Sequence, residues 1–180
     1  MEGPDLRPPY LSGPLVYLRA PIEGDKETAG AWLDDTFPIN SPRAEALLKE
    51  EYGARPGPRS RLRLMIVRRD GDRVVGGVRV SWGSEGRRCN LDFTMAPGEP
   101  DADSLRADAL STVVAWLRDQ LEAMVVGVTL AADQRATVQA AEAVGMVRNG
   151  TLRAWFKRSD GRVDAVVYEA LNPNWVVRDA

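Results

Sequence analysis

The segment Met124 to Leu130 (MVVGVTL) contains no charged residue and constrains the fold more than any other part of the 180-residue chain. A strand with apolar side chains on both alternating faces must be covered on both sides, as in sheets that carry helices on each face. One apolar stripe at helical spacing precedes this segment: Leu110, Val113, Val114, Leu117 and Leu121. Together these patterns predict a central strand with helices packed over both faces of its sheet.

Six further segments are predicted to be strands. The Asp70-Gly71-Asp72 turn joins the first two strands of an antiparallel meander, and Ser159-Asp160-Gly161 joins a final hairpin. The predicted strands besides the central one are residues 15–20, 61–69, 74–82, 88–95, 151–158 and 162–171.

Capping residues mark the ends of the other predicted helices. Asp25 and Ser41 are expected at the N-caps of two successive helices, because their side chains can accept a hydrogen bond from a backbone N–H group. Gly53 is expected just beyond the second of these helices. Gly145 is expected to end a later helix that begins near Arg135.

The fold class that follows is α/β (α+β): a mixed, mostly antiparallel seven-stranded sheet with helices on both faces. Residues 1–14 contain four prolines and are expected to form a proline-rich arm, since proline lacks a backbone donor. Residues 15–180 show no linker, so they are expected to form a single domain.

Composition excludes several function classes. The chain has no histidine, which removes Ser-His-Asp and Cys-His catalysis, and no metal site is predicted. Cys89 is the single cysteine, so no internal disulfide forms, and it shares a predicted buried strand face with Leu91. The net charge of −2 disfavours a general nucleic-acid partner, and the apolar runs are too short for a membrane span. With no signal peptide in view, a cytoplasmic location is expected.

The order of elements resembles the fold of the GCN5-related N-acetyltransferases, the GNAT family, and is most similar to the branch that acetylates ribosomal-protein N-termini. Five stretches carry this resemblance: Leu18-Arg19-Ala20-Pro21, Val74-Val75-Gly76-Gly77, Asp108-Ala109-Leu110, Ala136-Thr137 with residues 141–146, and residues 149–153. None is specific alone, and their order and spacing make the resemblance.

The resemblance implies that an amine attacks the thioester of acetyl-CoA directly, with the protein positioning both reactants. It implies that the cofactor pyrophosphate lies where the fourth strand of that fold turns into the central helix. The positions that correspond to cofactor contacts in the family are Met95, Ser104, Leu105, Arg106 and Gln134.

The turn that should hold the pyrophosphate departs from the family pattern. Ser104 stands at a family glycine position, Arg106 stands at the position of a small family residue, and Asp101 stands at the family Arg or Gln position. With Glu99 and Asp103, the turn carries three carboxylates. Two like charges about 5 Å apart repel by about 0.8 kcal/mol in water and about 3 kcal/mol at a dielectric constant near 20. Either an altered acyl-CoA site persists, or the acids cap the helix and fill the anion site themselves.

The catalytic candidates are also carried over from the family. Asn90 occupies the place of a frequent glutamate base, so Asp92, two residues along the strand, is the candidate base. Thr137 and Tyr168 are candidate acids for the departing thiolate; alternatively, Thr137 bonds the backbone and Tyr168 packs in the core. The substrate cleft is expected to include Trp32, Asn90 and Trp155.

Three functions are compatible with this pattern. The first is an acyl-CoA-dependent N-acyltransferase acting on a small-molecule amine or a protein N-terminus. The second is a GNAT-like protein that has lost acyl-CoA and uses its cleft for another ligand, in a binding, self-resistance or pathway-specific role. The third is an interaction role, with a homodimer through the last hairpin or the proline-rich arm.

Overall fold

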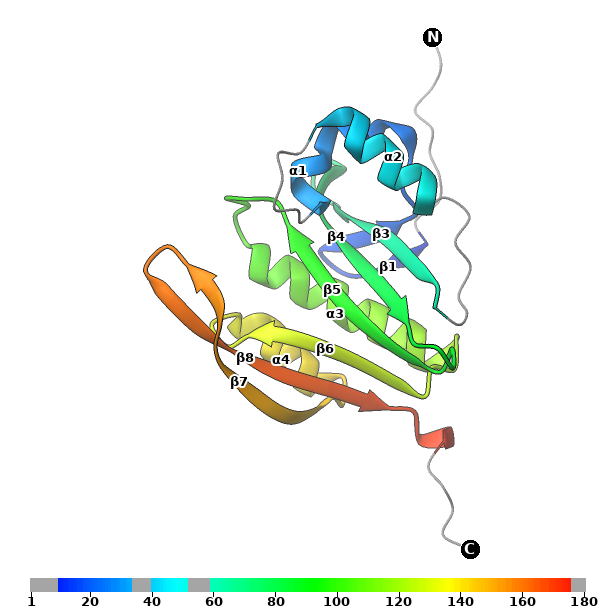
Figure 1. Ribbon diagram of the computed structural model, residues 1–180, viewed down its shortest axis with the longest axis vertical. Coiled ribbons are helices and arrows are strands. Elements are labelled where there is room, and N and C mark those ends of the chain that lie inside the picture. The colour runs from blue at the N-terminus through cyan, green and yellow to red at the C-terminus, as the bar shows by residue number, and fades with distance from the viewer. Residues whose placement is uncertain (1–9, 34–39, 52–58, 176–180) are drawn as a thin grey trace, which may run out of the picture.

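One continuous sheet forms the centre of the fold (Figure 1). The computed structural model describes residues 10–33, 40–51 and 59–175. Within these ranges the strands form an eight-stranded sheet in the order β1-β2-β3-β4-β5-β6-β8-β7, in which only β5 and β6 pair in parallel. The strands are β1 (Leu11–Ser12), β2 (Val16–Arg19), β3 (Arg61–Arg68), β4 (Arg73–Trp82), β5 (Arg88–Met95), β6 (Val125–Ala131), β7 (Val147–Arg158) and β8 (Gly161–Leu171).

Helices cover both faces of this sheet, as predicted from the uncharged central strand. In Figure 1, α1 and α2 lie together at the top of the view, whereas α3 and α4 lie behind the strands. The helices are α1 (Ala29–Trp32), α2 (Ser41–Glu51), α3 (Ala102–Asp119) and α4 (Arg135–Ala143), with short 3-10 turns η1 (Glu23–Thr28) and η2 (Pro173–Trp175). Among the helices of the described ranges, none is long and apolar enough to cross a bilayer.

Two hydrophobic clusters follow from the alternation of side chains along the strands. Leu64 and Ile66 of β3 belong to the larger cluster, which includes the apolar stripe of α3. Met65 and Val67 belong to the smaller cluster, which contains Trp32 of α1. The two faces of one strand therefore anchor two separate helical layers.

β1 is a strand that the sequence did not predict, and it raises the number of strands from the expected seven to eight. It lies within the segment expected to be a proline-rich arm, where Leu11 pairs with Leu18. The Asp108 carboxylate of α3 accepts hydrogen bonds from the N–H groups of Leu15 and Val16, at 2.7 and 2.9 Å. The chain is thus held against the domain before β2 begins. Residues 1–9 of the predicted arm lie outside the described residues.

The N-cap predicted at Asp25 is wrong. Asp25 lies inside η1, where its carboxylate accepts the N–H of Ile22 at 2.8 Å and pairs with Arg19 at 2.7 Å. Its side chain is buried, so this pair joins the end of β2 to the first helical turn. The sequence alone does not show that Arg19 is the ion-pair partner of Asp25.

The start of α2 also differs from the prediction. Asn40, rather than Ser41, caps the helix, because its Oδ1 accepts the N–H of Arg43 at 2.9 Å. Gly53, expected beyond the end of this helix, lies outside the described residues. Gly145 follows the end of α4 as predicted and has a φ of +82°, a conformation that suits glycine.

The parallel pair β5–β6 opens part of the way along its length. Arg88 to Leu91 pair with Val125 to Val128, and the register ends there. Beyond this point residues 92–95 of β5 and residues 129–131 of β6 diverge, as the two arrows in Figure 1 show. The sheet therefore contains a V-shaped opening between its two halves.

Candidate functional site

A cleft of about 370 Å³ lies at the opening between β5 and β6. Its volume is within the range of small-molecule sites in proteins. The walls come from β3 to β7, the end of α1, α3 and the turn before α4. The lining residues are Leu33, Arg63, Arg79, Asp92, Phe93, Thr94, Arg106, Thr129, Leu130, Gln134, Leu152, Trp155 and Phe156.

A row of charged side chains crosses the sheet beside the cleft. Arg63 pairs in register with Arg79, and Arg79 pairs in register with Asp92. The Arg79 guanidinium donates to the Asp92 carboxylate at 3.2 Å, and both side chains are exposed. Arg63 is buried, donates to the carbonyl oxygen of Trp32 at 2.9 Å and lies 5.1 Å from the centre of the Trp32 ring. Neighbouring strands thus present three charged groups to one side of the cleft.

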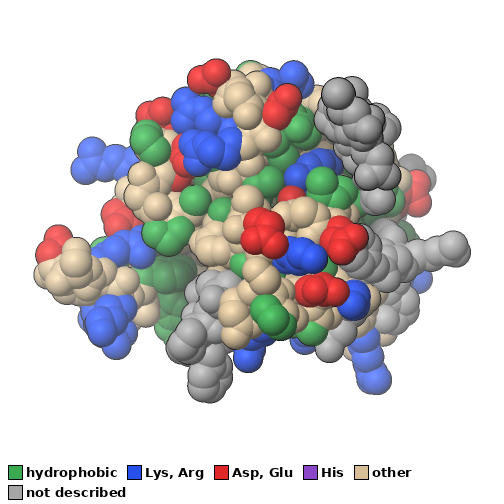
Figure 2. Space-filling view, turned by 90° about the horizontal axis from the view of Figure 1, so that it is seen from above, with side chains coloured by type: hydrophobic (Ala, Val, Ile, Leu, Met, Phe, Trp, Pro, Cys, Tyr) green, Lys and Arg blue, Asp and Glu red, His purple; other side chains and the backbone are tan. Residues whose placement is uncertain are grey.

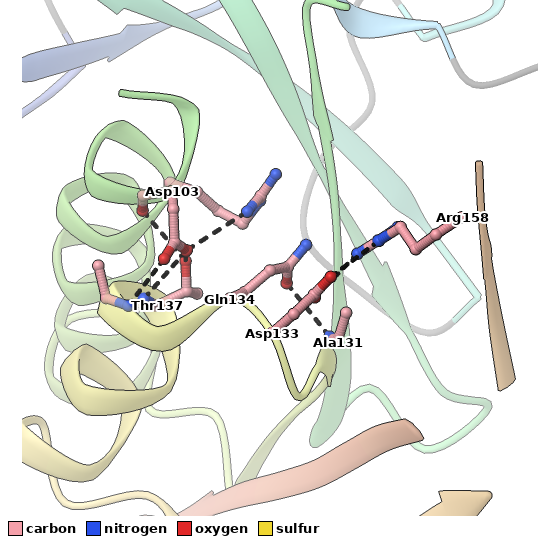
Figure 3. A network of polar contacts seen from close by, with 8 residues as sticks. Asp103, Ala131, Asp133, Gln134, Thr137 and Arg158 are labelled. Carbon is pink, nitrogen blue, oxygen red and sulfur yellow. Dashed lines mark hydrogen bonds and ion pairs between the residues drawn. The ribbon is translucent and has the colours of Figure 1, made fainter. Parts of the chain in front are cut away.

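Asp103 joins the first turns of α3 and α4 (Figure 3). Its carboxylate accepts hydrogen bonds from the N–H groups of Ala136 and Thr137, at 2.7 and 3.2 Å. The Thr137 hydroxyl lies 2.6 Å from the same carboxylate. Because the N-cap residue Gln134 makes no side-chain cap hydrogen bond, this acid from another helix caps α4.

Arg106 extends into the cleft from the same end of α3. Its side chain is 13% exposed, and its Nη1 lies 3.6 Å from the Asp103 carboxylate. Burial lowers the pKa of Arg106 from its ordinary value, although a guanidinium remains charged in proteins. The Arg106 guanidinium therefore lies close to the Asp103 carboxylate but beyond hydrogen-bond distance from it.

The acids of the loop before α3 have partners other than the helix end. The buried Glu99 carboxylate pairs with Arg73 at 2.6 Å and Arg68 at 3.1 Å. The hydrogen bond from Arg73, supported by Arg68, lowers the pKa of Glu99. Asp101 at the N-cap lies 3.7 Å from Arg68 and makes no side-chain cap hydrogen bond. Arginines thus offset the expected repulsion. In the alternative in which the acids cap the helix, Asp101 does stand at the N-cap, but its side chain makes no cap hydrogen bond.

The turn between β6 and α4 is held from two sides (Figure 3). The Gln134 Oε1 accepts the N–H of Ala131 at 3.2 Å. Asp133 pairs with Arg158 of β7 at 2.9 Å, which lowers the pKa of Asp133. These contacts fix the turn next to the cleft and tie it to the last hairpin.

Four of the predicted site residues meet in the cleft: Asp92, Arg106, Gln134 and Trp155. Trp32 lies under it, fully buried, and supports Arg63. The other predicted contacts lie outside the lining. Asn90 is exposed beside Gly127, Met95 packs against the larger hydrophobic cluster, Ser104 is exposed, and Leu105 is buried in the core.

The two candidate acids do not line the cleft. Thr137 is fully buried, and its hydroxyl is directed at Asp103. Tyr168 is buried in the larger cluster, and its hydroxyl donates to Glu142 at 2.8 Å. Burial, followed by the Glu142 carboxylate, raises the pKa of Tyr168. Both hydroxyls therefore have partners within the protein: the Thr137 hydroxyl bonds the Asp103 carbonyl oxygen as well as the carboxylate, and the Tyr168 hydroxyl bonds Glu142.

Sequence reasoning missed Arg63 and Arg79 as cleft residues. A usable signal was present in β3, because Arg63 has the same strand parity as Met65 and Val67 and so shares their face. For Cys89 the expectation of a buried thiol is confirmed, and burial raises its pKa to about 12. Within the described part of the chain, no cluster of acidic or thiol ligands could hold a metal ion.

Solved structures similar to this chain include acetyltransferases. The chain is 45% identical to a protein of Sphaerobacter thermophilus assigned as an acetyltransferase, over 92% of this chain and 97% of that one, with a TM-score of 0.72. A GNAT-family acetyltransferase of Bacillus anthracis shares the fold at 11% identity, with coverages of 90% and 98% and a TM-score of 0.66. The ribosomal-protein-S5-alanine acetyltransferase of Vibrio fischeri does so at 10% identity, with coverages of 91% and 97% and a TM-score of 0.66.

No family model and no curated protein matches the sequence. The structural relative at 45% identity nevertheless covers nearly the whole of both chains. The open parallel pair, the helices on both faces and this relative lead to one conclusion: the chain belongs to the GNAT family of acetyltransferases.

Proposed function

We propose that the protein is an acyl-CoA-dependent N-acyltransferase that transfers an acetyl group to a small-molecule amine or a protein N-terminus. The observation that carries this proposal is the cleft between β5 and β6, where apolar walls meet an exposed carboxylate. Membership of the GNAT family supports the reaction class.

Two parts of the structure fit an acyl-CoA, the start of α3 and the edge of β5 beyond Leu91. The amides of Ala102, Asp103 and Ser104 precede the first intrahelical donor, Leu105, and the N-cap side chain does not bond to them. Such amides at a helix start favour a phosphate group. The edge of β5 beyond Leu91 has no β6 partner in the described register. Its backbone N–H and C=O groups can therefore bond the amides of the extended pantetheine arm of acyl-CoA. When bound, acetyl-CoA supplies the thioester carbon that the amine attacks.

Asp92 is the residue proposed to accept the proton of the attacking amine. Its carboxylate lines the cleft, and the ion pair with Arg79 at 3.2 Å holds it on the sheet face. A carboxylate within reach of the amine can act as a general base directly or through one water molecule. Phe93, Leu130 and Phe156 form apolar walls that orient the reactants and limit access of water.

The contacts of Asp103 favour a second function, in which the fold has lost acyl-CoA and the cleft binds another ligand. Ser104 stands where the family pattern has a glycine and Arg106 where it has a small residue, so larger side chains replace them at both positions. Asp103 also accepts hydrogen bonds from the start of α4. Its carboxylate therefore joins the two helix ends next to the turn where the family resemblance places the pyrophosphate.

Calorimetric titration of the purified protein with acetyl-CoA, together with a thermal-shift assay, separates the two functions. At a hundredfold excess over the dissociation constant, binding should add about 2.7 kcal/mol to the free energy of unfolding. Free pantetheine is the matched control, because it lacks the phosphates that the helix start is proposed to hold. Absence of acetyl-CoA binding at millimolar concentration would refute the acyltransferase and leave the second function.

A further inference from the structure

We infer that the cleft binds an amine that carries an aromatic ring, and that the Trp155 side chain stacks against this ring. The inference rests on the proposed function, because it names the acceptor class of the same cleft. The juxtaposition that carries it is an exposed tryptophan beside a second aromatic side chain, Phe156, both directed into one cleft by a bulge in β7.

The strand β7 is irregular where it passes the cleft. Its pairing with β8 breaks off at Leu152 and resumes at Phe156, and the three residues between them lie opposite a single residue of β8, Asp164. In a regular strand neighbouring side chains point to opposite faces, so Trp155 would point away from the face that carries Leu152 and Phe156. All three side chains nevertheless line the cleft. The bulge is therefore what adds Trp155 to the cleft.

Side chains of β8 hold this bulge in place. Ala154 at its centre has a φ of +48°, a conformation that residues other than glycine rarely adopt. The N–H of Ala154 donates to the Asp164 carboxylate at 2.8 Å, and its carbonyl oxygen accepts from the Arg162 guanidinium at 2.9 Å. Strained backbone of this kind persists where surrounding contacts fix it, and it is concentrated at ligand sites. The hairpin itself therefore sets the position of Trp155.

Trp155 presents an uncovered aromatic surface. It is 58% exposed, the largest value among the five tryptophans. Trp175 is also partly exposed, but its Nε1–H donates to the Glu122 carbonyl oxygen and its ring lies under Arg87. Over the described ranges of the chain, the Trp155 side chain has neither a hydrogen bond nor a ring contact. A ring of the ligand can cover the surface that the protein leaves open at the cleft.

The charged groups of the lining already have partners within the protein. Arg79 pairs with Asp92 at 3.2 Å, Arg63 donates to a backbone carbonyl oxygen, and Arg106 lies 3.6 Å from Asp103. Figure 2 shows hydrophobic side chains in the hollow between the β7–β8 hairpin, at the left of the view, and the rest of the molecule, with side chains of both charges around them. The apolar walls are therefore the part of the cleft that distinguishes one amine from another.

An aromatic amine suits two parts of the cleft at once. Its ring would stack on Trp155 and meet Phe93 and Phe156, since paired aromatic rings gain more than the area that they bury. Its amine would approach the Asp92 carboxylate, which is the proposed base. The volume of about 370 Å³ accommodates one such amine together with the end of an acyl carrier.

The adenine ring of acyl-CoA is the other source of an aromatic group for Trp155. The test therefore measures acceptors and cofactor separately, by calorimetry on the full chain. The amines are phenethylamine, its saturated analogue cyclohexylethylamine and the polyamine spermidine, each titrated with and without excess coenzyme A. The cofactor probe is acetyl-CoA.

Two variants remove the Trp155 surface from the cleft in different ways. Trp155→Ala removes the ring. Deletion of Arg153 and Ala154 keeps the ring but makes the strand regular, so that Trp155 lies opposite Asp164 and points to the other face. Trp175→Ala is the matched control, because it removes the same side chain from an exposed position outside the cleft lining.

We expect phenethylamine to bind about threefold more tightly than cyclohexylethylamine and about tenfold more tightly than spermidine. Trp155→Ala and the deletion should each weaken phenethylamine binding about tenfold and remove its preference over the saturated analogue, whereas Trp175→Ala should change neither. If the deletion variant does not fold, Trp155→Ala decides alone.

Four results would overturn the inference: no binding of phenethylamine at millimolar concentration, equal or tighter binding of cyclohexylethylamine or spermidine, unchanged phenethylamine binding in Trp155→Ala, or a loss in that variant confined to acetyl-CoA. If phenethylamine binds and depends on Trp155 while acetyl-CoA does not bind, the proposed function fails and the aromatic site stands. If acetyl-CoA binds and phenethylamine does not, the proposed function stands and this inference fails.

Discussion

Asp92 is more than half exposed, lines the cleft and has Arg79 as its partner. Replacing it with asparagine keeps the shape of the side chain and removes the proton acceptor. We expect Asp92→Asn to lower kcat by about 10²-fold, the lower end of what general-base catalysis contributes. Because the side chain is exposed, the free energy of unfolding should change by no more than about 0.5 kcal/mol. Steady-state kinetics with acetyl-CoA and the amine found by titration measure the first effect, and urea denaturation measures the second.

Asp70→Asn is the matched control, since it makes the same change at an exposed position in the turn between β3 and β4. Equal kcat values for Asp92→Asn and wild type would remove Asp92 from the mechanism.

Single residues of the cleft could be predicted in two ways. Arg106, Gln134 and Trp155 followed from the family resemblance. Asp92 was identified because strand alternation puts it on the same face as Asn90, and it lies in the cleft with the other three. The hydroxyls of Thr137 and Tyr168 could not be assigned, because their partners, Asp103 and Glu142, come from distant helices. The sequence identifies a hydroxyl group as a possible hydrogen-bond donor, but it does not identify the acceptor.

At the scale of elements, the contact from α3 to α4 through Asp103 should stabilise both helices. Asp103→Ala removes the carboxylate that accepts from two backbone N–H groups and from the Thr137 hydroxyl, which keeps the carbonyl oxygen of residue 103 as an acceptor. We expect it to lower the free energy of unfolding by about 1–3 kcal/mol, the sum of a lost cap and unsatisfied buried donors. Urea denaturation measures the loss, and hydrogen exchange should accelerate at the amides of Ala136 and Thr137.

Asp103→Asn is the conservative comparison, since an amide keeps one acceptor oxygen and should lose less stability than alanine. If the alanine variant were as stable as wild type, the bonds at the start of α4 would have no net energetic role.

Elements were predicted better than the contacts that end them. The stripe from Leu110 to Leu121 and the glycine at 145 placed α3 and α4 correctly. The caps were missed because Asn40 lies one residue before the expected cap and Asp103 reaches α4 from another helix. β1 was missed because two residues between prolines carry too little pattern to show a strand.

At the scale of the whole molecule, Glu99 should make stability depend on pH. Its pKa in the folded state is lowered from the ordinary 4.5, chiefly by Arg73 and then by Arg68. A carboxyl group whose pKa is lowered by folding stabilises the protein fully at a pH above its ordinary pKa. This stabilisation is lost as the pH falls through the pKa of the folded state. We therefore expect Glu99→Gln to be less stable than wild type at neutral pH, and the difference to shrink on acidification below about pH 4.5.

Urea denaturation of both proteins across that interval measures this difference. Asp119 and Asp133 also have lowered pKa values, so each protein alone should lose stability in acid. A difference between the two proteins that stayed constant with pH would contradict the role given to Glu99.

The sheet with helices on both faces followed from apolar patterning along the chain, because burial of a strand on two sides requires two layers. The detailed site did not follow, because ion pairs such as Glu99 with Arg73 join segments whose proximity no local pattern records.

The end of pairing between β5 and β6 after Leu91 and Val128 separates the shape of the site from its chemistry. The opening consists of hydrogen bonds that two strands do not make, and any side chains that keep the strands straight and covered will preserve it. The opening is present here although Ser104 and Arg106 stand where the family pattern has small residues. The backbone therefore sets where a ligand can enter the sheet, whereas the side chains along the two diverging strands set which ligand it is.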